Sequence, residues 1–203
     1  MQVTLDPIVE IPLLRAFTQP GYLTEFLGGA VRLTQVSEYR DMECPNRLDR
    51  DEGEARHTVL GVEDTPVHYG GAWHNPIYVL CFSHPDVDRA HLVEQYGRHV
   101  IQLTDVPGFV SDLASAMKGQ CPEGREVSEI QLAPVRYNRD LVLDPEPSRV
   151  ERHRLMWAQK GVEFAADQEV RLALFLSGPV KGAPKTWTVQ SKPPATLEPA
   201  FAT

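Results

Sequence analysis

The sequence contains few cysteines. There are three among 203 residues, Cys44, Cys81 and Cys121, and they are widely spaced. No CxxC pair and no Cys/His pair at metal-ligand spacing occurs, and the count is odd, which argues against a disulfide framework and against a zinc module. We therefore expect reduced thiols and no bound metal.

Long apolar runs are also missing. No stretch approaches the roughly 20 apolar residues that a membrane-spanning helix needs. The opening MQVTLDPIVEIPLLR lacks the basic segment followed by an apolar segment that marks a secretory signal. These absences predict a cytoplasmic protein that has no membrane partner.

Basic residues are outnumbered. The 20 Lys and Arg residues face 28 Asp and Glu, giving a formal net charge of -8. A general nucleic-acid binder needs a clustered basic surface, so the acidic balance weakens that function. The one dense basic stretch is RVERHR, 149–154, which suits either a solvated helix face or a local nucleic-acid site.

The hydrophobic content of 42% is sufficient for one sizeable core. We predict a single α+β domain over residues 1–190 and a flexible, Pro/Ala-rich tail over 191–203. The apolar patterns, capping residues and glycines predict the following elements. Strands are expected at 12–17, 30–36, 77–82, 100–103, 130–137, 168–176 and 186–190, and helices at 20–27, 87–96, 107–117 and 149–159.

Four local features add detail to these elements. Asp86 is the expected cap of the second helix, and Ser148 with Glu151 forms a capping box for the last one. Pro134 would place its strand at a sheet edge or a bulge. Gly70-Gly71 is expected to form a turn.

A densely charged segment, Glu38 to His57, carries almost no core residues and is predicted to be a loop. It is either a solvated loop with local ion pairs or a polar recognition surface. On the second interpretation its substrate-binding side chains would be Tyr39, Arg40, Glu43, Arg47, Asp49 and Glu52.

Standard short catalytic motifs are missing: there is no Walker loop, GxGxxG, GxSxG or HExxH. Two weaker candidates remain. Ser83 follows a buried strand, but the adjacent His84 points to the opposite face, which disfavours a Ser–His pair. Asp167, Glu169 and Arg171 share one strand face, so a carboxylate lies beside a guanidinium. This pair either keeps a sheet edge soluble or stabilises a cationic transition state.

Several short segments together resemble a known family. They are FLGGAVRLTQVSEYRD, a strand that ends in Cys-Phe-Ser at Ser83, Tyr96-Gly97, Pro134–Tyr137, and Lys160 shortly before Gln168–Arg171. Over residues 12–176 the chain is similar to a widespread bacterial and phage family that is known as a domain of unknown function. Its arrangement in turn resembles the ADP-ribosyltransferase superfamily, which implies mixed sheets flanked by short helices.

The resemblance implies NAD as a substrate and a macromolecular acceptor, either protein or nucleic acid, for a toxin or a phage–host conflict protein. Arg15 would contact the NAD phosphates or ribose, Ser83 the nicotinamide half, and Glu169 the ribose as nicotinamide leaves. Lys160 and Arg171 would help to bind the substrate. The chain departs from the superfamily in Cys-Phe-Ser, where Ser-Thr-Ser is usual, and in Asp167, where Gln or Glu is typical.

Two other functions remain open. The first is a non-enzymatic, acidic binding or inhibitor protein of a phage or mobile element, which predicts an exposed, ion-paired Glu169 with no cleft joining it to Arg15 and Ser83. The second is a nucleic-acid-processing protein that works through RVERHR. Whether Arg15, Ser83 and Glu169 meet in one pocket distinguishes the enzyme from the binding protein.

Overall fold

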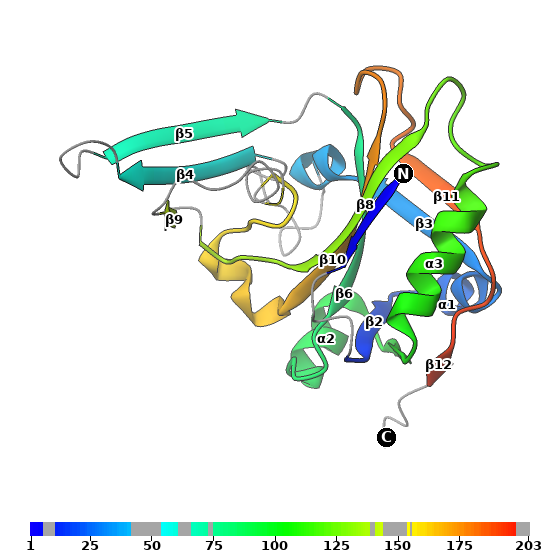
Figure 1. Cartoon of the computed structure of the whole chain (residues 1–203). Coiled ribbons are helices and arrows are strands. Elements are labelled where there is room, and N and C mark those ends of the chain that lie inside the picture. Colours follow the sequence, from blue (N-terminus) through cyan, green and yellow to red (C-terminus); the bar gives the residue numbers. More distant parts are fainter. Residues whose placement is uncertain are drawn as a thin grey trace.

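The computed structural model describes residues 1–5, 11–41, 54–60, 66–72, 75–138, 141–143, 154 and 156–197. Its main body is a nine-stranded mixed sheet with short helices packed around it (Figure 1). The sheet strands are β1 (Gln2–Leu5), β2 (Leu13–Phe17), β3 (Ala30–Gln35), β6 (Ile77–Ser83), β7 (His99–Leu103), β8 (Val127–Pro134), β10 (Glu169–Leu176), β11 (Thr186–Gln190) and β12 (Thr196–Leu197). The predicted mixture of α and β structure is therefore confirmed.

The helices are short. They are α1 (Pro20–Leu27), α2 (Arg89–Tyr96) and α3 (Val106–Met117), together with the 3-10 helices η2 (Val36–Asp41) and η4 (Val162–Asp167). None of the helices in the described part of the chain has the length and apolarity needed to cross a membrane.

The sheet divides at β6. One edge of β6 pairs with β10 along its length, from Ile77 to Ser83. The other edge pairs with β3 only at Tyr78 and Val79, and with β2 only at Ser83. β2 and β3 therefore lie on the same edge of β6 but pair with different parts of it. The two strands diverge between Val79 and Ser83 of β6. The segment Leu80–Phe82 has no strand neighbour on that edge.

Two apolar layers cover the two faces of the sheet. Alternate residues of β10, such as Val170 and Leu172, join the larger cluster with α1 and α3. The intervening Ala173 and Phe175 pack with Trp157 on the opposite face. Every residue of β10 is buried, so β10 is a central strand that is covered on both sides.

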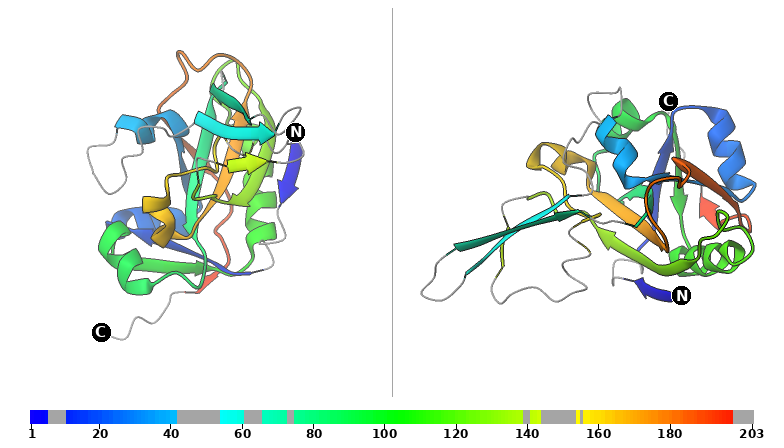
Figure 2. Two further views of the ribbon diagram at one scale, coloured as in Figure 1. Left: turned by 90° about the vertical axis from the view of Figure 1, so that its left-hand side faces the viewer. Right: turned by 90° about the horizontal axis from the view of Figure 1, so that it is seen from above.

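A second sheet projects from the main body (Figure 2). It contains three strands in the order β5-β4-β9, with β4 at Glu54–Leu60, β5 at Pro66–Ala72 and β9 at Leu141–Leu143. Two predictions are wrong here. Gly70-Gly71 lies inside β5 rather than in a turn, and the predicted loop Glu38–His57 contains part of η2 and the beginning of β4. Pairing between the two strands of the hairpin overrides the turn preference of glycine.

Other element boundaries also differ from the predictions. Helix α2 begins at Arg89 and is capped by Asp88, not Asp86, because the Asp88 carboxylate accepts from the amides of Ala90 and His91. Strand β8 lies between β1 and β10 rather than at an edge, and Pro134 is its last residue, so its missing N–H falls where the strand ends.

The predicted helix 149–159 is wrong at its C-terminal end, where residues 156 and 157 form a turn, 158 a bend, and Gln159 bridges to Arg136. The capping box, Ser148 and Glu151, lies outside the described residues. The predicted tail is held on the sheet as far as Leu197. The Ser191 amide donates to the Gly29 carbonyl at 2.8 Å, and β12 pairs with β7.

Candidate functional site: the cleft at the sheet split

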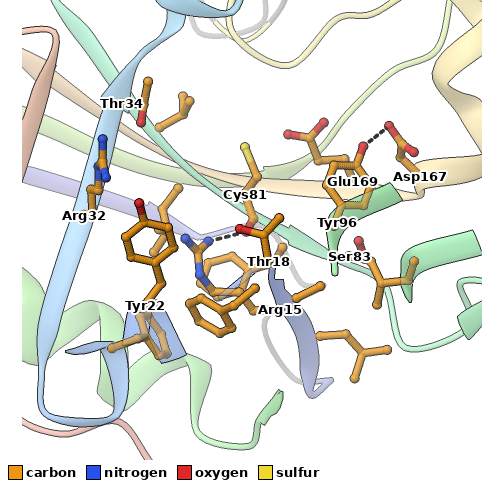
Figure 3. Close-up of a pocket in the computed structure, with 18 of the residues that line it drawn as sticks. Arg15, Thr18, Tyr22, Arg32, Thr34, Cys81, Ser83, Tyr96, Asp167 and Glu169 are labelled. Atoms are coloured by element: carbon orange, nitrogen blue, oxygen red, sulfur yellow. Dashed lines mark hydrogen bonds between the residues drawn. The ribbon is translucent and has the colours of Figure 1, made fainter. Parts of the chain in front are cut away.

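A cleft of about 330 Å³ opens where β2 and β3 diverge from β6. We call it the split cleft. Arg15 from β2, Ser83 from β6 and Glu169 from β10 all line it, with Arg15 near its centre and the other two toward one end (Figure 3). The three residues that the resemblance singled out, drawn from three separate strands, therefore meet in one cavity.

Arg15 occupies the space that the missing strand neighbour leaves. Its Nη1 donates to the backbone carbonyl of Cys81 at 2.6 Å. Cys81 lies midway between Val79, which pairs with β3, and Ser83, which pairs with β2. A buried carbonyl without a partner costs free energy, so this side-chain hydrogen bond stabilises the unpaired segment of β6.

The guanidinium of Arg15 is surrounded by aromatic rings. Its Cζ lies 5.1 Å from the ring centroid of Phe17, 5.4 Å from that of Phe26 and 5.7 Å from that of Phe82. Its buried Nε has no hydrogen-bond partner, and no carboxylate of the described residues pairs with it. Burial lowers the pKa of Arg15, although the group remains a cation at neutral pH.

Glu169, in contrast to Arg15, forms ion pairs with two cations. Only 6% of Glu169 is exposed, and its carboxylate accepts from Arg171 Nε at 2.6 Å and from Lys160 Nζ at 2.8 Å. Arg171 is completely buried and also donates to the Trp157 carbonyl at 2.6 Å. This charge cluster is fixed by the alternation of β10, which places Glu169 and Arg171 on one face.

The cations decide the ionisation of Glu169. Burial alone would raise the pKa of its carboxyl, but the charges of Arg171 and Lys160 outweigh burial and lower the pKa well below its ordinary value. Glu169 is therefore a carboxylate at neutral pH. It can accept hydrogen bonds or stabilise positive charge, but it cannot act as a general acid.

A second buried carboxylate, Asp167, also lines the split cleft. Helix α2 anchors it, because Tyr96 Oη donates to Oδ2 and His91 Nε2 lies 2.9 Å from Oδ1 (Figure 3). Between Asp167 and Glu169 the backbone turns through Gln168, which has a φ of 42°, a left-handed conformation that is uncommon for a residue other than glycine. The strained turn joins the end of η4 to the beginning of β10.

Cys81 places a thiol on the cleft wall, 3.6 Å from the hydroxyl of Tyr39. Burial and the nearby charge of Glu169 raise the pKa of Cys81 to about 12. The thiol is therefore protonated at neutral pH. A protonated thiol is a poor nucleophile, so this cysteine does not suit covalent catalysis.

The predicted substrate-binding residues have different outcomes. Tyr39 and Lys160 line the split cleft, whereas Arg171 lies behind Glu169 and supports it. The backbone of Arg40 belongs to η2. Glu43, Arg47, Asp49 and Glu52 lie outside the described residues.

Several cleft residues were not predicted as site residues, among them Tyr22, Arg32, Cys81 and Tyr96. In the sequence, Arg32 is a polar residue of an alternating strand and Tyr22 is part of the apolar pattern of a helix. The Cys-Phe-Ser segment did point to Cys81, and Tyr96-Gly97 to Tyr96, but only as features of a resemblance. What brings all four together is the sheet split, which no local pattern encodes.

No metal-binding group is present in the described residues, where no cluster of three or more His, Cys, Asp or Glu side chains could hold an ion. Comparison with protein-family models, with curated proteins and with solved structures finds no match to this chain. The case for a function therefore rests on the geometry and charge of the split cleft.

Proposed function

We propose that the chain is an ADP-ribosyltransferase-like enzyme that binds NAD in the split cleft and transfers ADP-ribose to a macromolecular acceptor. The observation that supports this most is the convergence of Arg15, Ser83 and Glu169 on one cavity. An ADP-ribosyltransferase-like fold is part of the same proposal. It is supported by the place of these residues on an early, a middle and a late strand beside the sheet split.

The chemistry follows from the ionisation of Glu169. In the transfer, the bond between the nicotinamide nitrogen and the ribose C1′ breaks, and its electron pair leaves with nicotinamide. The sugar becomes cationic, an acceptor nucleophile forms a new bond at C1′, and the acceptor gives up a proton. A fixed carboxylate beside the sugar lowers the energy of that cationic transition state.

The rest of the cleft suits such a ligand. The unpaired guanidinium of Arg15 provides hydrogen-bond donors for a phosphate group. Tyr39 and Tyr96 add aromatic surface near Glu169. The site therefore combines an anion-binding group and a carboxylate within one cavity, as a phosphorylated riboside requires.

The alternative of a non-enzymatic binding protein receives less support. It requires an exposed Glu169 that no cleft joins to Arg15 and Ser83, whereas Glu169 is buried and all three line the split cleft. The nucleic-acid alternative rests on 149–154, of which only Arg154 lies within the described residues.

NAD consumption tests the proposal. The parent protein should release nicotinamide from NAD, and Glu169→Gln should lower the rate at least about 100-fold, an effect of the size expected for losing one preorganised electrostatic contact. The matched control is Glu129→Gln on β8, outside the split cleft, which should keep the parent rate.

Glu169→Gln disturbs a buried charge cluster, so a second measurement is needed. NAD should raise the thermal midpoint of the parent protein, because a ligand that binds the native state stabilises it. Arg15→Met should abolish this shift while retaining the parent circular-dichroism spectrum. A parent protein that neither binds nor consumes NAD would overturn the proposal.

A further inference from the structure

A second arginine lies at the outer end of the split cleft. Arg32 projects from β3, and its Cζ lies 5.8 Å from the ring centroid of Tyr22 (Figure 3). Both residues are exposed and both line the cleft. No carboxylate in the described part of the chain forms an ion pair with Arg32.

Helix α1 carries an aromatic ring beside each of the two arginines. Arg32 stacks on Tyr22, and Arg15 stacks on Phe26. Tyr22 and Phe26 are four residues apart on α1, so they are neighbours on one helix face, with Cβ atoms about 5–6 Å apart. The two guanidinium groups are therefore supported by rings one helical turn apart.

The sheet register places both arginines beside the same gap. Continuing the β3 register beyond Thr34–Val79 would bring Arg32 opposite Cys81. Continuing the β2 register beyond Leu14–Ser83 would bring Ala16, the neighbour of Arg15, to the same place. The two strands diverge there, so Arg15 and Arg32 belong to the two strands that border the gap beside the unpaired segment of β6.

We propose that Arg15 and Arg32 together bind a diphosphate, one phosphate at each guanidinium, and that the ligand of the split cleft is a nucleoside diphosphate or a derivative of one. Two cationic groups in one cleft, neither of them paired with a carboxylate of the described residues, suit two adjacent phosphates better than a single phosphate. A sugar joined to the phosphate at Arg15 extends toward Glu169, and the other end of the ligand passes Arg32 and Tyr22. Identifying this ligand as NAD rests on the proposed function.

One charged group at this end opposes the binding of an anion. Glu25 on α1 is exposed and lines the cleft, three residues from Tyr22. Its carboxylate repels phosphate. Replacing Glu25 should therefore strengthen the binding of an anion, whereas replacing Arg32 should weaken it.

Calorimetric titration with ADP, AMP and inorganic pyrophosphate provides the experiment. The parent protein should bind ADP about 10-fold or more tightly than AMP, since a hydrogen bond to a charged group contributes about 1.5 kcal/mol or more. Arg32→Gln should remove this preference, and Glu25→Gln should strengthen ADP binding. The control is Arg98→Gln, an exposed arginine outside the cleft, which should bind like the parent. Weak binding of pyrophosphate compared with ADP would show that the nucleoside is part of the ligand.

The outcomes separate the two proposals. Preference for ADP that depends on Arg32, in a protein that does not consume NAD, would support the diphosphate site and overturn the transferase. Equal binding of ADP and AMP, or an Arg32→Gln variant that binds both like the parent, would overturn the diphosphate site even if NAD were consumed. Arg32 is exposed, so its replacement does not threaten folding.

Discussion

Two regions of the split cleft differ in how their charged side chains are paired. At one end, Glu169 is enclosed by Lys160 and Arg171, so each charge has an opposite partner within the fold. Toward the other end, Arg15 is enclosed by aromatic rings and makes one hydrogen bond, to a backbone carbonyl. The carboxylate therefore contributes to the folded state itself, whereas the guanidinium keeps donors for which the described residues provide no acceptor. Stability and ligand binding should depend on different ends of one cavity.

The largest expected effect is on stability at the Glu169 end. Glu169→Gln removes the negative charge between Lys160 and Arg171 and breaks the ion pair that each of these buried cations forms with it. We expect a loss of about 3–5 kcal/mol in the free energy of unfolding, as for other buried ion pairs broken on one side. Urea denaturation measures it. Glu129→Gln, the partly buried control, should change the value by about 0.5 kcal/mol or less. Equal stability of the two variants would show that the ion pairs of Glu169 do not stabilise the fold.

At acid pH, the difference in the free energy of unfolding between the parent and Glu169→Gln should disappear. The pKa of Glu169 is lower in the folded protein than the roughly 4.3 of an unfolded Glu, so its contribution is complete above about pH 5 and disappears as pH falls toward the folded value. Below about pH 4, the difference in stability between parent and Glu169→Gln should shrink by about 1.4 kcal/mol per pH unit. Urea titrations at several pH values measure it, and other carboxyls cancel in the difference. A gap that stays constant with pH would show that Glu169 gains nothing from its cations.

Arg15→Met should have a much smaller effect on stability. The variant loses one hydrogen bond and the ring contacts, but it also removes a desolvated charge, so the free energy of unfolding should change by about 1 kcal/mol or less in either direction. Denaturation of the unliganded protein measures this. A loss as large as that of Glu169→Gln would show that Arg15 is mainly a structural residue, and the contrast between the two ends would fail.

The smallest effect is expected for Tyr39→Phe, between the two ends. It removes the contact of the hydroxyl with the Cys81 thiol and keeps the ring, which lies 6.0 Å from the Arg171 Cζ. A weak hydrogen bond to sulfur is involved, so we expect a loss of about 0.5 kcal/mol or less. A larger loss in the same denaturation assay would mean that this hydroxyl holds the Glu169 cluster in place.

Much of the fold was predictable where local signals agree. Pro20 at the beginning of α1 and Gly28-Gly29 at its end fixed that helix, and the apolar run of β6 and the alternation of β10 fixed two central strands. Predictions failed where a distant partner decides. Gly70 and Gly71 favour a turn by themselves, but pairing with β4 makes them part of a strand.

The same limit applies to the site. Strand alternation predicted that Glu169 and Arg171 share a face, and they form an ion pair. Ser83, a candidate because it ends an apolar strand, lines the split cleft. Arg32 and Tyr22 were not predicted as site residues. They line the cleft that opens where β2 and β3 diverge, and this divergence depends on pairing with β6, far from both strands in the chain.

The Arg15 side chain donates to the Cys81 carbonyl at a place where a neighbouring β-strand would ordinarily do so. Where an ordinary sheet would present a backbone amide to this carbonyl, the chain presents a guanidinium, which has further N–H groups to offer. Three residues of β6 between Val79 and Ser83 set the length of the gap. Continued pairing along these three residues would close the gap, so the split cleft is an interruption in the hydrogen-bond ladder of the sheet.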